Sequence, residues 1–196
     1  MHILEIPAKI SINFTSPYDL GLIACDIMKQ FSQDPKKQLG AAIIDNSYNI
    51  YGLGSNTYPY KKIITKEDKE LLNSNNFNNE HRYRLEHAER NAIFFAIRNS
   101  NPLKNNTLVV NYTPCVDCAN SIVNSQLCAV VDSSIPNFDH HRWGSGWKYV
   151  VEDLFKRSGV QYINHRVDPK VKDKVIFPLE KLIMEYYKNN YKITNL

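Results

Sequence analysis

The sequence lacks the features of a membrane or secreted protein. No stretch approaches the run of roughly 18 apolar residues that a membrane-spanning helix requires. The N-terminal residues contain no basic region followed by an apolar core and a small-residue cleavage site, so they predict no secretory signal. At 196 residues the chain has about the length of one domain. We therefore expect a cytoplasmic protein that makes no membrane contact.

Cysteine is scarce, and the four cysteines do not suggest a disulfide framework. Cys115 and Cys118 form a Cys-x-x-Cys pair. The sequence contains no second pair of this kind, which a zinc ribbon would need. Cys25 and Cys128 stand in apolar runs, and we expect both to be buried, unreactive core residues.

The excess of positive over negative charge is also small. The formal net charge is +4, and no dense basic tract of the kind that binds nucleic acid is present. Nucleic acid is therefore not the expected partner. A mildly basic protein instead suits a small anionic ligand such as a nucleotide.

Helical and strand patterns alternate along the chain after an initial hairpin. We expect strands over residues 39–44, 49–54, 107–111, 128–131 and 160–163, and helices over residues 17–31, 87–101, 114–124 and 146–158. This order predicts an α/β protein, with a mixed sheet between helices and with its last strands parallel.

Two segments lie outside this alternation. Residues 55–80 form a long insertion with one short helix over 65–72, and it suits a lid over a ligand as well as a surface excursion. The tail carries one amphipathic helix over 178–188. We therefore divide the chain into a domain over residues 1–165 and a C-terminal helical appendage over residues 166–196, packed on that domain.

The Cys-x-x-Cys pair is expected at a helix N-terminus. Pro114 precedes Cys115, and Pro is favoured at the start of a helix. Unpaired N–H groups and the positive end of the helix dipole stabilise thiolates there, and the thiolate is the form that binds a metal. A single pair is ambiguous, because thioredoxin-like redox sites also contain it.

The tripeptide His87-Ala88-Glu89 resolves this ambiguity. A lone His-x-Glu is usually structural. Here, however, it stands at a predicted helix start and is followed by a strand and then by Pro114-Cys115-Val116-Asp117-Cys118 at the next helix start. This joint pattern is the signature of zinc-dependent nucleobase deaminases. We expect His87, Cys115 and Cys118 to bind Zn²⁺, with water in the fourth position and Glu89 as the proton shuttle.

Three stretches resemble the deoxycytidylate (dCMP) deaminase branch of the cytidine deaminase superfamily. They are residues 32–44, residues 52–59, and the extended zinc signature over residues 86–93 and 113–119. The resemblance implies an α/β/α sandwich with a five-stranded sheet and assembly into homo-oligomers, either dimers or hexamers. It also implies hydrolysis of dCMP to dUMP and ammonia in pyrimidine salvage.

The same resemblance suggests which residues bind the nucleotide. Asn56 is the candidate sugar contact, and Arg82 and Arg84 are candidate phosphate partners, although lone basic residues are more often solvated surface charges. Tyr112 stacks on the base or packs in the core. The substrate-binding residues predicted in this way are Asn56, Ala88, Tyr112, Thr113, Pro114, Arg82 and Arg84.

The sequence departs from the family pattern at two positions. Thr57 replaces the second glycine of the family's Gly-x-Asn-Gly loop. The segment over residues 131–136, after the fourth strand, lacks the aromatic residue usual in that branch, and Asp132 and residues 140–144 stand in its place. The substrate therefore stays open among dCMP, CMP, deoxycytidine, a free base and a tRNA base. A non-catalytic, zinc-bearing nucleotide-binding protein is the alternative of a different class, but a purely structural zinc would not need Glu89.

Overall fold

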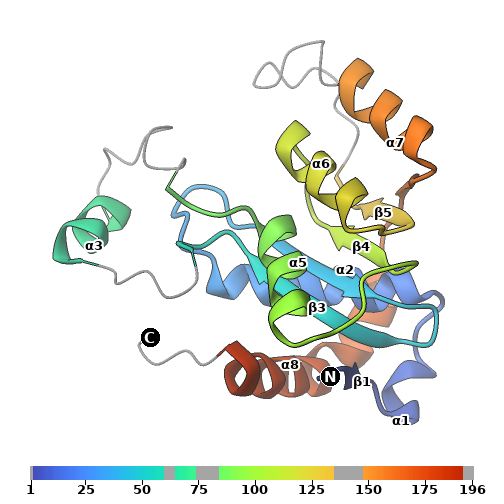
Figure 1. Ribbon diagram of the computed structural model, residues 1–196. Helices are drawn as coiled ribbons and strands as arrows, with labels where there is room; N and C mark the ends of the chain where they lie inside the picture. The colour runs from blue at the N-terminus through green and yellow to red at the C-terminus, as the bar shows by residue number, and fades with distance from the viewer. Residues whose placement is uncertain (1, 60–64, 74–83, 135–147, 192–196) are drawn as a thin grey trace.

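The computed structural model describes residues 2–59, 65–73, 84–134 and 148–191 (Figure 1). Its strands are β1 (Leu4–Glu5), β2 (Gly40–Ile44), β3 (Asn49–Ser55), β4 (Thr107–Val110), β5 (Ala129–Asp132) and β6 (Gln161–Asn164). Its α-helices are α1 (Ala8–Ser11), α2 (Pro17–Met28), α3 (Lys66–Asn73), α5 (Ala88–Arg98), α6 (Val116–Asn124), α7 (Asp153–Ser158) and α8 (Pro169–Tyr191). A 3₁₀ turn (Lys29–Phe31) follows α2, and a π-helical turn (Lys148–Glu152) precedes α7. No helix in these residues is both long and apolar enough to cross a membrane.

The strands form one mixed sheet in the order β1-β3-β2-β4-β5-β6. β2 pairs antiparallel with β3 and β4, whereas β4, β5 and β6 are parallel. The predicted α/β class and the parallel last strands are confirmed. The expected count of five strands was wrong by one, because Leu4 and Glu5 pair antiparallel with Ile50 and Asn49 and add an outer strand beside β3. A strand of two residues is too short to give a periodic signal.

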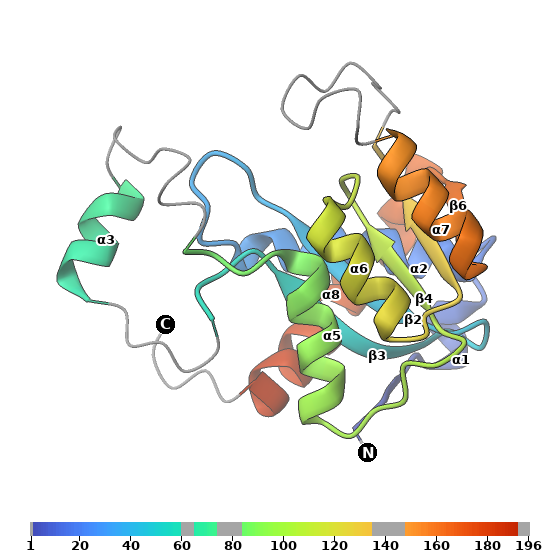
Figure 2. The ribbon, with the colours of Figure 1, turned by 45° about the horizontal axis from the view of Figure 1, so that its top comes forward.

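Helices cover both faces of the sheet, which makes a three-layer sandwich (Figures 1 and 2). α2 and α8 lie on one face, where their buried residues share a core with Leu53 and Val109. α5, α6 and α7 lie on the other face and share a second core with Ile43 and Leu108. The central strand β2 is buried along its whole length, as its continuous apolar run predicted.

The C-terminal helix α8 is longer than its sequence pattern predicted. It begins at Pro169 rather than at Pro178, and Asp168 Oδ1 accepts a hydrogen bond from Lys170 N at the start. Pro178 lies inside the helix, although proline usually marks a helix start or break. Packing against α2 outweighs this preference, since five residues of α8 are buried in the shared core: Val171, Val175, Leu179, Ile183 and Tyr187.

The polar ends of several elements meet along the border of the sheet at which the parallel strands end, here called the sheet edge. Gly40 pairs with Ser55 and Ala41 with Val110, so the start of β2 lies beside the ends of β3 and β4. Val110 is in register with Asp132, so β5 ends at the same edge. Ligands of open α/β sheets bind outside the carboxyl ends of the parallel strands, and here that edge also receives the N-termini of α5 and α6 (Figure 1).

Two glycines of β3 allow α5 to approach the sheet closely. A Cβ at Gly54 would lie 2.2 Å from the carbonyl oxygen of Ala88, and a Cβ at Gly52 would lie 2.5 Å from that of Ala92. Both contacts are with backbone atoms, which cannot rotate away. The glycines therefore set how closely the first turns of α5 approach the end of β3.

Gly54→Ala should displace the N-terminus of α5. We expect the free energy of unfolding to fall by about 1–3 kcal/mol, as for other overpacked sites, together with weaker binding of the metal predicted at His87. Urea denaturation and zinc titration measure both effects. Gly159→Ala is the matched control, since its cost comes from a φ of 70° with no atom within 4 Å of the added Cβ. Unchanged zinc affinity in Gly54→Ala would contradict this role.

Candidate metal centre

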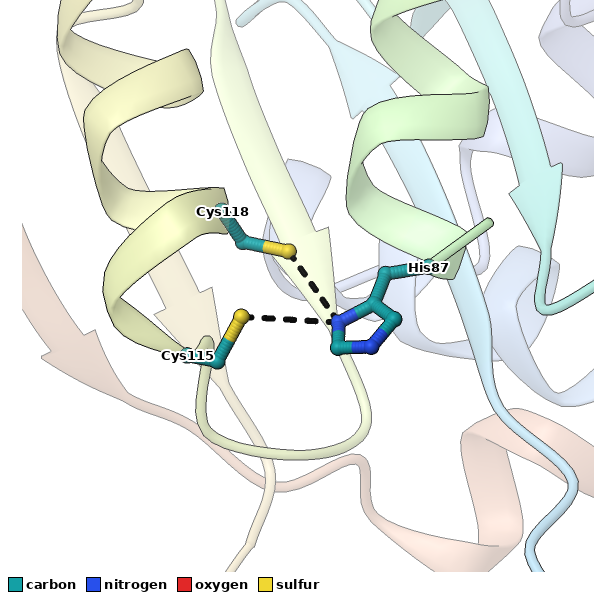
Figure 3. A group of neighbouring side chains, drawn as sticks. All are labelled: His87, Cys115 and Cys118. Atoms are coloured by element: carbon teal, nitrogen blue, oxygen red, sulfur yellow. Dashed lines mark hydrogen bonds between the residues drawn. The ribbon is translucent and has the colours of Figure 1, made fainter. Parts of the chain in front are cut away.

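His87, Cys115 and Cys118 come together at the sheet edge, as predicted (Figure 3). His87 Nδ1 lies 3.5 Å from Cys115 Sγ and 3.4 Å from Cys118 Sγ. The three ligand atoms lie within 4.8 Å of one another. Figure 3 shows both sulfur atoms pointing from the start of α6 toward the imidazole at the start of α5.

The three residues fit a tetrahedral zinc ion. Sulfur at about 2.3 Å and nitrogen at about 2.0–2.1 Å from such an ion would stand about 3.6 Å apart. The two measured N–S distances, 3.5 and 3.4 Å, agree with this value before any adjustment of the side chains. Two sulfur donors and one imidazole also match the ligand preference of zinc, and three protein ligands leave one position open.

The positions of the ligands at the helix starts explain the motif spacing. His87 is the N-cap of α5 and Cys115 is the N-cap of α6, and neither makes the side-chain hydrogen bond of an ordinary cap. Cys118 stands three residues after Cys115, and side chains at these two positions converge at the end of a helix. The predicted starts at His87 and Pro114 were therefore early by one and two residues. The expected placement of the ligands at helix N-termini is correct.

The electrostatics of the site favour one thiolate even without a metal. A hydrogen bond from the Cys118 side chain, assisted by His87, lowers the pKa of Cys115 to about 4. The same pairing, with burial, raises the pKa of Cys118 well above its ordinary value. The bond to Cys115 also raises the pKa of His87. Metal binding requires neutral imidazole and two thiolates, so loading the site releases protons.

Glu89 lies in the first turn of α5 and is 5% exposed. Burial raises the pKa of its carboxyl group, while His87 acts in the opposite direction. Its Oε2 atom is buried without a hydrogen-bond partner, in contrast to nearly every other buried side-chain oxygen in the described residues. An unpaired buried carboxylate oxygen is costly unless a further group satisfies it. Water at the open metal position would be such a group.

The predicted sugar contact, Asn56, lies at the same edge directly after β3. Its Oδ1 accepts hydrogen bonds from Ser32 Oγ and Leu39 N, both at 2.8 Å, and its Nδ2 donates to the Lys37 carbonyl at 2.8 Å. The side chain therefore holds the segment that leads into β2. Its contact with a sugar stays a prediction.

The residues around Cys115 are also at this edge. Pro114 and Ala88 are buried, and Thr113 Oγ1 donates to Asp132 Oδ2 at 2.7 Å. The Lys37 ammonium lies 3.1 Å from the centroid of the Tyr112 ring, a cation–π contact that covers one face of the ring. Base stacking by Tyr112 would have to use the opposite face of the ring and stays a prediction.

The phosphate contacts predicted for the two arginines stay predictions. Arg82 lies outside the described residues, and Arg84 Nη1 lies 4.0 Å from Asp68 Oδ1, so its phosphate role also stays a prediction.

The prediction that Cys25 is buried is confirmed, but that for Cys128 is wrong. β5 begins one residue after Cys128, whose exposed Sγ lies 3.1 Å from the carbonyl oxygen of Asn105.

Hydrogen bonds that the sequence did not predict fasten α5 to the end of β3. Thr57 N donates to the Glu86 carbonyl at 3.2 Å, and Glu86 N donates to the Thr57 carbonyl at 2.7 Å. Asn91 Nδ2 donates to the Ser55 carbonyl at 2.8 Å and to Thr57 Oγ1 at 3.1 Å. These bonds join the loop after β3 to the helix that carries His87. No local pattern marks them, because they join residues about 30 positions apart.

Comparisons with known proteins agree with this geometry. A family model described as the cytidine and deoxycytidylate deaminase zinc-binding region matches residues 19–133. The chain is 32% identical over 83 residues to the deoxycytidylate deaminase of Enterobacteria phage T2, which covers 40% of this chain and 37% of that protein. It is 30% identical over 102 residues to the deoxycytidylate deaminase of Pongo abelii, which covers 52% of this chain and 56% of that protein.

Solved structures show the same fold. The dCMP deaminase from cyanophage S-TIM5 in apo form superposes with a TM-score of 0.54 at 17% identity, covering 82% of this chain and all (100%) of that one. The structure of the same cyanophage enzyme in complex with dCMP and dUMP gives a TM-score of 0.51 at 21% identity, covering 72% and 90% of the two chains. At these identities the likeness concerns the fold.

Cys118→Ser should abolish stoichiometric zinc binding, because serine cannot supply a thiolate at the third ligand position. Cys128→Ser, which changes the exposed cysteine, is the matched control and should keep one zinc per chain. Metal analysis after dialysis against a weak chelator measures both. One zinc per chain in Cys118→Ser would contradict the ligand assignment.

Proposed function

The chain belongs to the cytidine and deoxycytidylate deaminase family, and on this premise we propose that it hydrolyses dCMP to dUMP and ammonia with zinc as cofactor. The observation that carries the proposal is the buried, unpartnered carboxylate oxygen of Glu89 beside a zinc-compatible His/Cys/Cys group. A structural zinc site has no use for such a carboxylate. This favours an enzyme over a non-catalytic nucleotide-binding protein.

His87, Cys115 and Cys118 would hold the zinc ion, with two thiolates to balance its charge. When bound in a three-ligand site, zinc lowers the pKa of water at the open position and makes it a nucleophile at neutral pH. The remaining chemistry falls to the side chains of the protein.

Glu89 moves the protons. Its Oε2 accepts a proton from the attacking water as the oxygen bonds to C4 of the cytosine ring, and it delivers that proton to N3. Glu89 then carries the second proton of the water to the amino group. The C4–N4 bond breaks, ammonia leaves, and C4 keeps the oxygen as a carbonyl. The raised pKa of Glu89 suits a group that must both accept and return a proton near neutral pH.

The choice of dCMP rests on the two curated relatives and on the cyanophage enzyme, which are deoxycytidylate deaminases by name. The matches cover 37% and 56% of the two curated relatives, so substrate and assembly are carried over as proposals. We propose that Asn56, Ala88 and residues 112–114 form the wall of the nucleotide site and that Arg84 faces the phosphate. We further propose a homo-oligomer in a reducing, cytosolic compartment, which would keep both zinc-binding thiols reduced.

Ammonia release from a panel of substrates tests the proposed function. We expect the zinc-loaded protein to release ammonia from dCMP faster than from CMP, deoxycytidine, cytosine or guanine. Glu89→Gln should keep one zinc per chain and lose activity by a factor of about 10²–10⁴, the usual contribution of a positioned acid–base group.

Asp117→Asn is the matched control for Glu89. Asp117 occupies the same position in the first turn of α6 that Glu89 occupies in α5, but it is exposed. We expect this variant to keep its activity. Full activity in Glu89→Gln would remove Glu89 from the mechanism, and no turnover of any panel member by zinc-loaded protein would overturn the proposed function.

A further inference from the structure

Asp132 is a buried carboxylate at the edge of the sheet that carries the metal centre. It is the last residue of β5 and is 1% exposed. Its Oδ2 lies within hydrogen-bond distance of three hydroxyls, those of Tyr162 (2.6 Å), Thr113 (2.7 Å) and Ser134 (2.8 Å). Its Oδ1 accepts from Ser134 N at 2.7 Å. The carboxylate therefore has donors on both oxygens.

The main chain of Asp132 is held in place as well as its side chain. Its carbonyl oxygen accepts from Asn164 Nδ2 at 3.1 Å and from His165 N at 3.1 Å. Tyr162 stacks on Phe155 with ring centroids 6.1 Å apart, so the phenol that donates to Asp132 is itself held by α7. Asp132 thus joins the ends of β5 and β6 into one rigid support.

This support reaches the metal ligands through Thr113. Thr113 follows the end of β4 and precedes the ligand Cys115 by two residues, with the buried Pro114 between them. Its hydroxyl contacts both Asp132 Oδ2 and Ser134 Oγ, the latter at 2.9 Å. The loop between β4 and α6 is therefore fastened to the neighbouring strands by a side chain next to the proline. The position of that loop determines where the Cys115 sulfur lies.

We propose that Asp132 is a positioning residue of the zinc site, which holds residues 113–115 so that the Cys115 thiolate points at His87. The effect on turnover rests on the proposed function, whereas the effect on the metal site does not. Asp132 acts through Thr113, and its side-chain hydrogen bonds go to Thr113, Ser134 and Tyr162 rather than to the metal ligands. Because both carboxylate oxygens are engaged inside the protein, it is not placed to bind the base.

A neutral side chain of the same shape tests this role. In Asp132→Asn the amide NH₂ must face either the N–H of Ser134, where a donor meets a donor, or the three hydroxyls, which would then have to rotate from donating to accepting. We expect about tenfold weaker zinc binding, at the lower end of the range for groups that support metal ligands, because Asp132 acts through the main chain. Tyr162→Phe removes one donor and should give a smaller change in the same direction.

Cobalt substitution reports on the site without any substrate. The thiolate-to-cobalt charge-transfer and d–d bands depend on the positions of the sulfur ligands. We expect these bands to shift in Asp132→Asn and Tyr162→Phe and zinc titrations to show the weaker binding. With dCMP as substrate we expect a lower kcat and a higher KM, because Thr113 and Pro114 of the proposed nucleotide wall move together with Cys115.

Asp45→Asn is the matched control. Asp45 also follows a strand and accepts from a tyrosine hydroxyl, Tyr51 at 2.9 Å, and from the backbone N–H groups of Ser47 and Asn49. It lies after Ile44, which is in register with Thr107 at the opposite edge of the sheet. We expect Asp45→Asn to lose stability without any change in the cobalt spectrum or zinc affinity.

Each outcome decides the proposal. Unchanged cobalt bands and zinc affinity in a folded Asp132→Asn would overturn it. Shifted cobalt bands and weaker zinc binding in Asp45→Asn would overturn it as well. Should Asp132→Asn fail to fold, Tyr162→Phe decides in the same way. Failure of the proposed function is recognised separately, because wild-type protein would then deaminate no substrate while the cobalt spectra still showed whether Asp132 positions the ligands.

Discussion

The convergence of two helix N-termini at one edge of the sheet is the constraint on which the site depends. α5 brings His87 and Glu89 to this edge, and α6 brings Cys115 and Cys118. The proposed metal ligands His87 and Cys115 occupy the N-cap positions that hydroxyl or carboxylate side chains usually fill, and the helix dipole favours the thiolate form of cysteine there. The glycines of β3 and the bonds of Asn91 set how closely α5 approaches. A shift of either helix would separate the imidazole from the sulfurs.

The parts of this arrangement that a short stretch of chain encodes could be predicted from the sequence. The group of His87, Cys115 and Cys118 that could hold a metal ion was predictable, because the spacing of Cys115 and Cys118 reflects the geometry of a single helix start. The order of strands and helices followed from apolar periodicity, and the helix predicted over residues 146–158 ends where α7 does, at Ser158, before Gly159 with its φ of 70°.

The remaining features depend on contacts between distant segments. β1 forms only because Leu4 meets Ile50, and α8 continues through Pro178 because its buried face packs on α2. The network around Asp132 joins Thr113 to Tyr162, which lie 49 positions apart. The sequence marked Thr113 and Asp132 individually, but no local pattern indicates that the two side chains are in contact. The same holds for Asn56, whose amide binds the segment before β2 as well as lying at the proposed nucleotide site.

Isotope labelling tests the central claim, which is that the His/Cys/Cys centre and Glu89 together carry out hydrolytic deamination of a cytosine nucleotide. The zinc-loaded protein is incubated with dCMP in water enriched in oxygen-18, and the product is analysed by mass spectrometry. The account predicts dUMP that carries one oxygen-18 atom in its base, with release of an equal amount of ammonia. Absence of dUMP, or dUMP formed without the label, would contradict it.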